Sequence, residues 1–167
     1  MHDMPFIYLV LPFALAWACY TEIRQRRISN WLTLPLMALG LGAGLIDGDV
    51  SGLLDAFLGL LIAGGVFLPF CLLGVVGGGD MKLMAGVGAV VSYPMVLRVL
   101  TDTCIAGGLI AIAIMAWHGI LFTTLANVFR IMVGMPRRRD GLRHPPLVPY
   151  GLAIAIGTLF AVFFQSF

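Results

Sequence analysis

Long apolar stretches, separated by short polar or glycine-containing segments, run along the whole chain. A helix needs about 20 mostly apolar residues to cross a bilayer, and several of these stretches approach or reach that length. We expect five spans at residues 4–21, 31–46, 53–76, 81–91 and 147–164, and a sixth between Met95 and Gly134. The pattern predicts an all-α fold, a polytopic membrane helix bundle with about six transmembrane helices, built as a single domain over residues 1–167.

The stretch from Met95 to Gly134 is twice as long as one span requires. Either residues 95–117 span and residues 118–134 lie along the inner membrane face, or both halves span. The first arrangement puts the basic segment Arg137–Arg143 in the cytoplasm, as the positive-inside rule favours. We therefore expect an interfacial helix over residues 118–134 and both chain ends outside.

Composition supports a membrane protein, because 60% of the residues are hydrophobic and only 11% are charged, against roughly 25% charged in soluble domains. The arginines cluster beside apolar segments, at Arg24–Arg27 and Arg137–Arg143, so they indicate topology and contact with lipid, and no nucleic-acid partner is expected. The three cysteines form no C-x-x-C pair, and we expect neither a metal site nor a cofactor.

Two acids stand at the inner ends of expected spans. Asp80 follows the glycines 77–79 and precedes Lys82, and Glu22 ends the first span two residues before Arg24. An ionisable residue at membrane depth is costly and usually marks a working site. We expect the glycines to break the helix before Asp80 and to let another segment approach closely.

This topology places Glu22 and Asp80 at the same depth, near the cytoplasmic boundary. Two carboxyl groups that face each other in a low-dielectric site share a proton, so that one is an acid and the other a base. Such a pair around a water molecule can attack a peptide carbonyl without a covalent nucleophile. His2, His118 and His144 are isolated, so no Cys–His or Ser–His arrangement competes.

Three segments carry a resemblance to a known family. They are Gly77-Gly78-Gly79-Asp80-Met81-Lys82-Leu83, the stretch Glu22-Ile23-Arg24-Gln25-Arg26-Arg27-Ile28-Ser29-Asn30-Trp31, and Pro149-Tyr150-Gly151. The first is similar to the GxGD-x-K motif of the A24 prepilin peptidases. The second resembles their first motif, an aspartate followed by basic residues and Ile-Pro-Asn, and the third resembles the start of their last span. The chain looks closest to the short CpaA- or TadV-like branch that serves Flp or Tad pilins.

The resemblance implies an intramembrane aspartic endopeptidase of the GxGD class in the bacterial inner membrane. It would remove the basic leader of a type IV-like prepilin at the cytoplasmic face, with pilus-assembly proteins as further partners. Asp80 and Glu22 take the catalytic positions, and the supporting positions are Gly77, Gly79, Lys82, Arg24 and Asn30. Asn30 is also expected to cap the second span. The chain lacks the length and the cysteine pairs of bifunctional members, so we expect no methyltransferase activity.

Two positions depart from the family pattern: Ser29 replaces a proline and Glu22 replaces the first aspartate. The extra methylene moves the carboxylate by roughly 1 Å, a displacement that can cost about 10²-fold in rate. If Glu22 works, the glycines 77–79 must accommodate its longer arm; we expect reduced activity that Glu22→Asp raises. One alternative is a catalytically impaired homologue that binds prepilin or assembly partners. Another is a small proton-coupled carrier with Glu22 and Asp80 as its relay, for which Asp55 and Asp102 are the candidates on the outer half.

Overall fold

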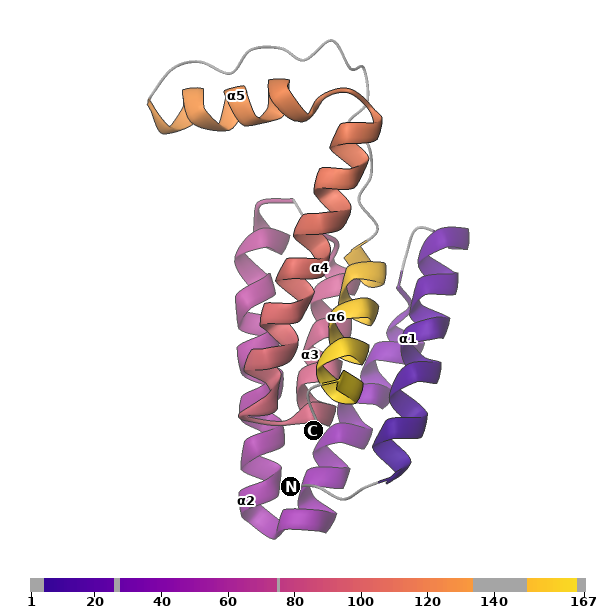
Figure 1. Cartoon of the computed structure of the whole chain (residues 1–167). Coiled ribbons are helices and arrows are strands. Elements are labelled where there is room, and N and C mark those ends of the chain that lie inside the picture. The colour runs from indigo at the N-terminus through magenta and orange to yellow at the C-terminus, as the bar shows by residue number, and fades with distance from the viewer. Residues whose placement is uncertain (1–4, 26–27, 75, 134–149, 165–167) are drawn as a thin grey trace. The chain divides into compact units, whose positions relative to one another are not determined.

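The computed structural model describes residues 5–25, 28–74, 76–133 and 150–164. Within these ranges the regular structure is six α-helices and no strand, which confirms the all-α prediction. The helices are α1 (Pro5–Gln25), α2 (Asn30–Leu72), α3 (Gly78–Val91), α4 (Met95–Trp117), α5 (Leu121–Met132) and α6 (Tyr150–Phe164) (Figure 1). The chain divides into two compact units. One unit is Met1–Ala106 together with Pro149–Phe167, and the other is Gly107–Val148.

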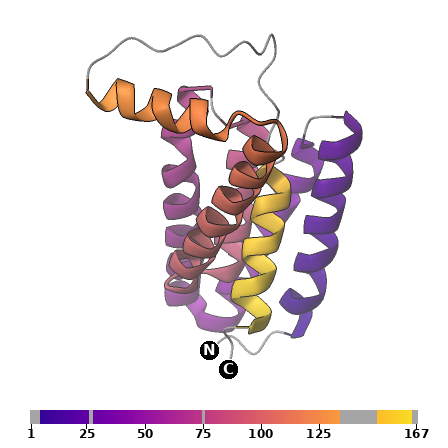
Figure 2. The same cartoon turned by 45° about the horizontal axis from the view of Figure 1, so that its top comes forward.

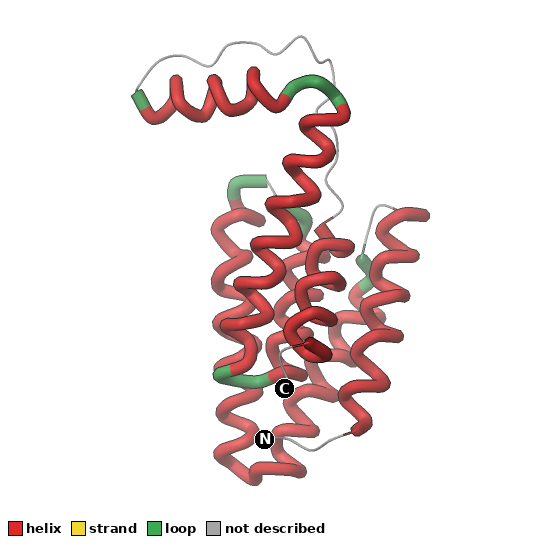
Figure 3. The backbone as a smooth tube through the Cα atoms, viewed as in Figure 1, coloured by secondary structure: helices red, strands yellow, loops and turns green. Residues whose placement is uncertain are grey.

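α2 is a helical hairpin rather than one straight helix. Asp49 has non-helical angles, φ 53° and ψ −139°, and the chain turns back there, as Figure 3 shows. The two arms approach so closely that a Cβ atom on Gly44 would lie 2.6 Å from the carbonyl oxygen of Gly52. The turn expected at residues 47–49 is therefore confirmed, and the expected second and third spans are the two arms of α2. The second arm ends at Leu72, four residues before the expected end.

Glycines set the connection between α2 and α3. Gly74 takes the left-handed conformation (φ 70°) that commonly ends a helix, and its N–H donates to the carbonyl of Cys71. α3 then begins at Gly78, with Gly77 as its N-cap, so Asp80 lies in the first helical turn. The expectation that the glycines break the helix before the acid is thus wrong for Gly78 and Gly79, which are part of α3.

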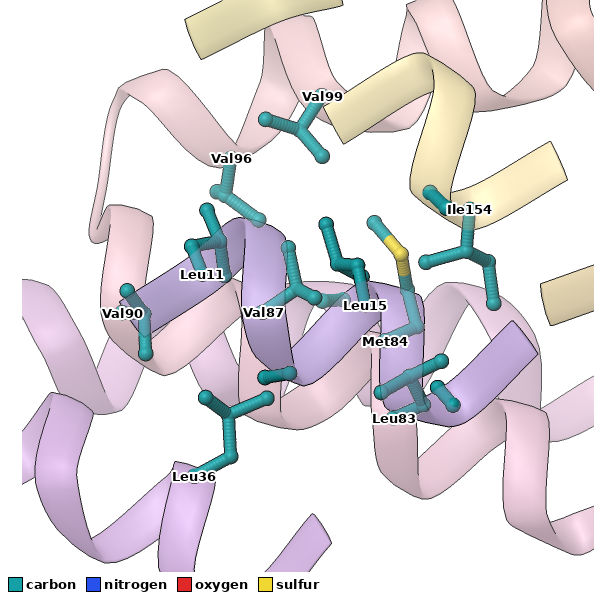
Figure 4. Packing of buried hydrophobic residues seen from close by; sticks show 14 of the residues in the cluster. Leu11, Leu15, Leu36, Leu83, Met84, Val87, Val90, Val96, Val99 and Ile154 are labelled. Atoms are coloured by element: carbon teal, nitrogen blue, oxygen red, sulfur yellow. The ribbon is translucent and has the colours of Figure 1, made fainter. Parts of the chain in front are cut away.

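α3 is the central helix of the first unit. Its residues 83–90 are all buried, although a helix on the outside of a bundle would bury only one face. α2 packs against it so closely that a Cβ atom on Gly40 would lie 2.6 Å from the backbone of Ala89. Figure 4 shows apolar side chains of α3 packed with side chains from four other helices. Those of α3 are Leu83, Met84, Val87 and Val90, and those of the other helices are Leu11, Leu15, Leu36, Val96, Val99 and Ile154.

A short turn at residues 92–94 joins the carboxyl end of α3 to the amino end of α4. The N–H of Tyr93 donates to the carbonyl of Asp55 at 3.0 Å, which ties this turn to the second arm of α2. The turn expected at residues 92–94 is thus confirmed. α4 ends at Trp117, where the sequence predicts it to end, and Gly119 (φ 67°) redirects the chain into α5.

α5 exposes Phe122, Leu125 and Phe129 on one side, as an interfacial helix would. Its placement on the inner membrane face stays a prediction, and the basic segment Arg137–Arg143 lies outside the described residues.

By length and composition, α2 and α4 are able to cross a membrane, and both expose many large apolar side chains. This is consistent with a membrane bundle, whereas the count of six spans stays a prediction. At the start of the chain α1 continues past Glu22, the expected end of the first span, to Gln25. Arg24, which we expect in a basic loop, therefore belongs to the helix.

Candidate active site

Three helix ends meet at one end of the first unit: the carboxyl end of α1 and the amino ends of α3 and α6 (Figures 1 and 2). Ile28, just after α1, packs between the starts of the other two helices. A Cβ atom on Gly79 would lie 3.0 Å from the Cβ atom of Ile28, and one on Gly151 would lie 3.6 Å from its Cδ1 atom. The start of α3, which carries Asp80, and the start of α6 therefore share one neighbour.

Glu22 sits against the amino end of α6. Its Oε1 atom accepts a hydrogen bond from the N–H of Gly151 at 3.3 Å, and the N–H groups of Tyr150 and Leu152 also interact with its carboxylate. The first N–H groups of a helix have no partner within that helix, and they attract negative charge. Glu22 thus caps α6 from another helix, while its Oε2 atom is buried and accepts no hydrogen bond from the described residues.

Asp80 has a parallel arrangement at the start of α3. Only 8% of its surface is exposed, and its Oδ2 atom accepts a hydrogen bond from the N–H of Gly77 at 3.2 Å. This is one half of a capping box, which Gly77 cannot complete because it has no side chain. Its Oδ1 atom is buried and has no hydrogen-bond donor within the described part of the chain.

The surroundings make both acids weaker than usual. Glu22 and Asp80 lie at the inner ends of expected spans, outside α2 and α4, the two helices that are long and apolar enough to cross a membrane. Burial, and after it the charge of Glu22, raises the pKa of Asp80 to about 6, against the opposing hydrogen bond from Gly77. Burial also raises the pKa of Glu22, while the hydrogen bonds from the start of α6 oppose that rise. The charge of one acid therefore acts on the other, as in a carboxyl pair that shares one proton.

Lys82 and Asn30 form a second link at this end of the unit. The Lys82 Nζ atom donates to the Asn30 Oδ1 atom at 3.0 Å and so joins α3 to α2. The expectation that Asn30 caps the second span is wrong, because Ser29 is the N-cap and its Oγ atom accepts the N–H of Trp31 at 3.2 Å. The serine that replaces the family proline therefore has a function of its own at the start of α2.

Of the remaining supporting positions, the two glycines lie at the site and Arg24 does not contact either acid in the described structure. Gly77 contacts Asp80 and Gly79 contacts Ile28, whereas Arg24 is exposed and lies over the ring of Tyr20 at 5.7 Å from its centroid. The sequence predicts that the glycines 77–79 accommodate the arm of Glu22. In the structure this arm lies against Gly151 instead. Glycine costs about 1 kcal/mol in a helix, so its presence in the first turn of α6 was the available signal of a close approach.

The site contains two carboxyl groups, and each has one buried oxygen atom that accepts no hydrogen bond from the described residues. Each carboxyl is fixed by a backbone N–H through its other oxygen. This arrangement suits proton transfer to and from a third molecule. Among the described residues, no three His, Cys, Asp or Glu side chains gather as a metal site would require.

Comparison with known proteins gives one match. Residues 9–112 match the model of the type IV leader peptidase family, which covers well over half of the chain and includes both acids. α6 and Gly151 lie beyond the matched residues. No curated protein and no solved structure matches this chain.

Proposed function

Because this chain belongs to the type IV leader peptidase family, whose members are aspartic-type proteases of membranes, we propose that it is an intramembrane endopeptidase of the GxGD class. Its substrate is a type IV-like prepilin, and on the resemblance of its motifs we assign it to the CpaA- or TadV-like branch that serves Flp or Tad pilins. It acts in the bacterial inner membrane as a multi-pass protein, beside pilus-assembly proteins, and carries no methyltransferase activity.

The observation that supports this function is that the carboxyl groups of Glu22 and Asp80 have the same hydrogen-bonding pattern. Each acid is held by one backbone N–H and keeps one buried oxygen without a partner in the described structure. Glu22 interacts with more backbone N–H groups, which favour its ionised form, so we assign it the role of base. Asp80, whose pKa is raised by burial and by the charge of Glu22, holds the proton and acts as the acid.

In the reaction, Glu22 takes a proton from a water molecule as the water oxygen bonds to the scissile carbonyl carbon. Asp80 supplies a proton to the reacting peptide group, and the carbon–nitrogen bond breaks with the nitrogen protonated. The products are a free leader carboxylate and a pilin with a new amino end. The two acids exchange their protonation states during the cycle, so no covalent intermediate is required.

A cleavage assay with a purified Flp-type prepilin in lipid vesicles tests this function. We expect the unmodified chain to cleave the leader and Asp80→Asn and Glu22→Gln to abolish cleavage, because neither amide exchanges a proton. The matched control is Asp102→Asn on α4, which changes another partly buried acid and should keep cleavage. Cleavage by Asp80→Asn at the unmodified rate would eliminate the aspartic mechanism.

The substrate enters from the membrane as an apolar helix and leaves its basic leader in the cytoplasm. The family resemblance suggests cleavage after a glycine at that junction, and a glycine can unwind and expose its backbone to a recessed acid pair. Replacing this substrate glycine by leucine should block processing of the prepilin. Unchanged processing would count against this docking mode.

The second candidate is a homologue that binds prepilin or assembly partners without cutting. It is favoured by one observation, the glutamate at position 22 in place of an aspartate. Absence of cleavage by the unmodified chain, together with retained binding of the prepilin, would support this candidate.

A further inference from the structure

The contact between Glu22 and Gly151 joins residues 129 positions apart in the chain. The Gly151 N–H donates to Oε1 of Glu22, and the Gly151 carbonyl accepts from the Sγ atom of Cys19 at 3.7 Å. Cys19 and Glu22 lie one turn apart on α1. Both backbone groups of Gly151 are thus engaged by the same face of α1.

A side chain at position 151 would collide with the acid and with little else. A Cβ atom built on Gly151 would lie 2.5 Å from Oε2 and 3.2 Å from Cδ of Glu22. The next atom, Cδ1 of Ile28, would be 3.6 Å away, which is an ordinary contact. The methyl group of an alanine therefore displaces the end of one flexible side chain and leaves the backbone packing in place.

We propose that Gly151 is the positioning residue for Glu22: its lack of a side chain lets the longer glutamate arm reach the backbone N–H groups at the start of α6. Those groups fix the Oε1 atom and so hold the carboxylate in one position. The inference rests on the function proposed above and concerns a residue beyond the matched part of the chain.

Glu22 and Gly151 are then a matched pair. An aspartate at position 22 would withdraw the carboxylate by roughly 1 Å, a misplacement that can lower a rate about 10²-fold. The shorter arm would lose the hydrogen bond from Gly151 but would leave room for a methyl group there. This revises the expectation from the sequence: in the unmodified chain, Glu22→Asp should lower cleavage.

The test compares cleavage by five chains: the unmodified chain, Gly151→Ala, Glu22→Asp, the double variant, and Gly65→Ala. The last is the matched control, because a Cβ atom on Gly65 in α2 meets nothing within 4 Å. We expect Gly151→Ala to lower kcat by about tenfold or more, with the melting temperature kept, and Gly65→Ala to have no effect. Glu22→Asp should lower cleavage in the unmodified chain and raise it in Gly151→Ala.

The effect of Glu22→Asp on the cleavage rate thus has opposite signs in the two chains. A glycine with only a structural role would not give this result. The inference is overturned if Gly151→Ala cleaves at the unmodified rate, or if Glu22→Asp changes the rate by the same factor in both chains.

Amide hydrogen exchange separates this inference from the proposed function. If the unmodified chain does not cleave prepilin, the function fails, yet the Glu22 contact remains measurable. We expect the amides of Tyr150, Gly151 and Leu152 to exchange faster in Glu22→Ala than in the unmodified chain, with unchanged rates in α4. Equal exchange rates at these three amides in both chains would show that the Glu22 contact is absent and would overturn the role of Gly151.

Discussion

The Nζ atom of Lys82 lies 3.0 Å from the Oδ1 atom of Asn30, which joins the amino-terminal parts of α3 and α2 although 52 positions separate the two residues. Asp80 lies two residues before Lys82 on the same helix. The bond therefore holds the start of α3, and with it one acid of the pair, against α2.

The Lys82–Asn30 bond should act as a unit in catalysis. We expect Lys82→Ala and Asn30→Ala each to lower prepilin cleavage severalfold without eliminating it, because the bond orients α3 but touches no reacting atom. The double variant should be no worse than the poorer single variant, since residues in one hydrogen-bonded pair give non-additive effects. Arg98→Ala, at an exposed cation on α4, is the control. Additive losses from Lys82→Ala and Asn30→Ala would contradict a shared role.

The raised pKa of Asp80, about 6, predicts a pH dependence of stability. An acid that holds its proton more tightly in the folded state adds stability fully below its unfolded pKa, about 3.9 for aspartate. That contribution is lost as the pH rises through about 6. The melting temperature in detergent should therefore fall over this range in the unmodified chain.

The fall should be smaller in Asp80→Asn, which removes the titrating group. It should also be smaller in Glu22→Gln, because the charge that helps to raise the pKa of Asp80 is gone. Thermal unfolding of the three chains at a series of pH values measures this. An unchanged profile in Asp80→Asn would show that the pKa of Asp80 is not raised, and an unchanged profile in Glu22→Gln would show that the charge of Glu22 does not act on Asp80.

Close backbone packing between α2 and α3 should make Gly88 intolerant of a side chain. A Cβ atom on Gly88 would lie 2.7 Å from the Cβ atom of Ala63 and 2.9 Å from the backbone of Gly59. Overpacking of this kind costs about 1–3 kcal/mol, so Gly88→Ala should lower the melting temperature. Gly65→Ala on α2 is the control, and equal melting temperatures of the two variants would refute the tight contact.

Membrane topology provides a separate prediction. By the positive-inside rule, we expect the arginine clusters at Arg24–Arg27 and Arg137–Arg143 to lie in the cytoplasm. A reporter fused after Gly141 should be active in the cytoplasm, and one fused after Gly48, in the turn of α2, should be active outside. A periplasmic signal at Gly141 would reject the six-span arrangement.

Local signals were sufficient to predict most helix limits. The Asp-Gly-Asp stretch 47–49 marked the turn of α2, and Ser92-Tyr93-Pro94 marked the start of α4, because such residues favour turns. The predicted cap of α2, Asn30, lies one residue after the observed cap, Ser29, because the two residues are neighbours and both are good caps.

The contacts of the candidate site were harder to predict, because they join distant parts of the chain. Motif spacing indicated that Glu22 and Asp80 act together, but nothing local in the sequence shows that the start of α6 holds Glu22. Likewise, the glycines 77–79 were expected to accommodate Glu22, and only the packing of the helices reveals that Gly151 does so.

The capping of α6 by Glu22 has a consequence for biosynthesis. The acid belongs to α1, which leaves the ribosome before the other described helices, while its hydrogen-bond donors belong to the last described helix, 129 residues later. A nascent chain that ends before residue 150 carries both acids but leaves Glu22 without those donors. The contacts of Glu22 are therefore complete only after α6 has joined the other helices, late in synthesis.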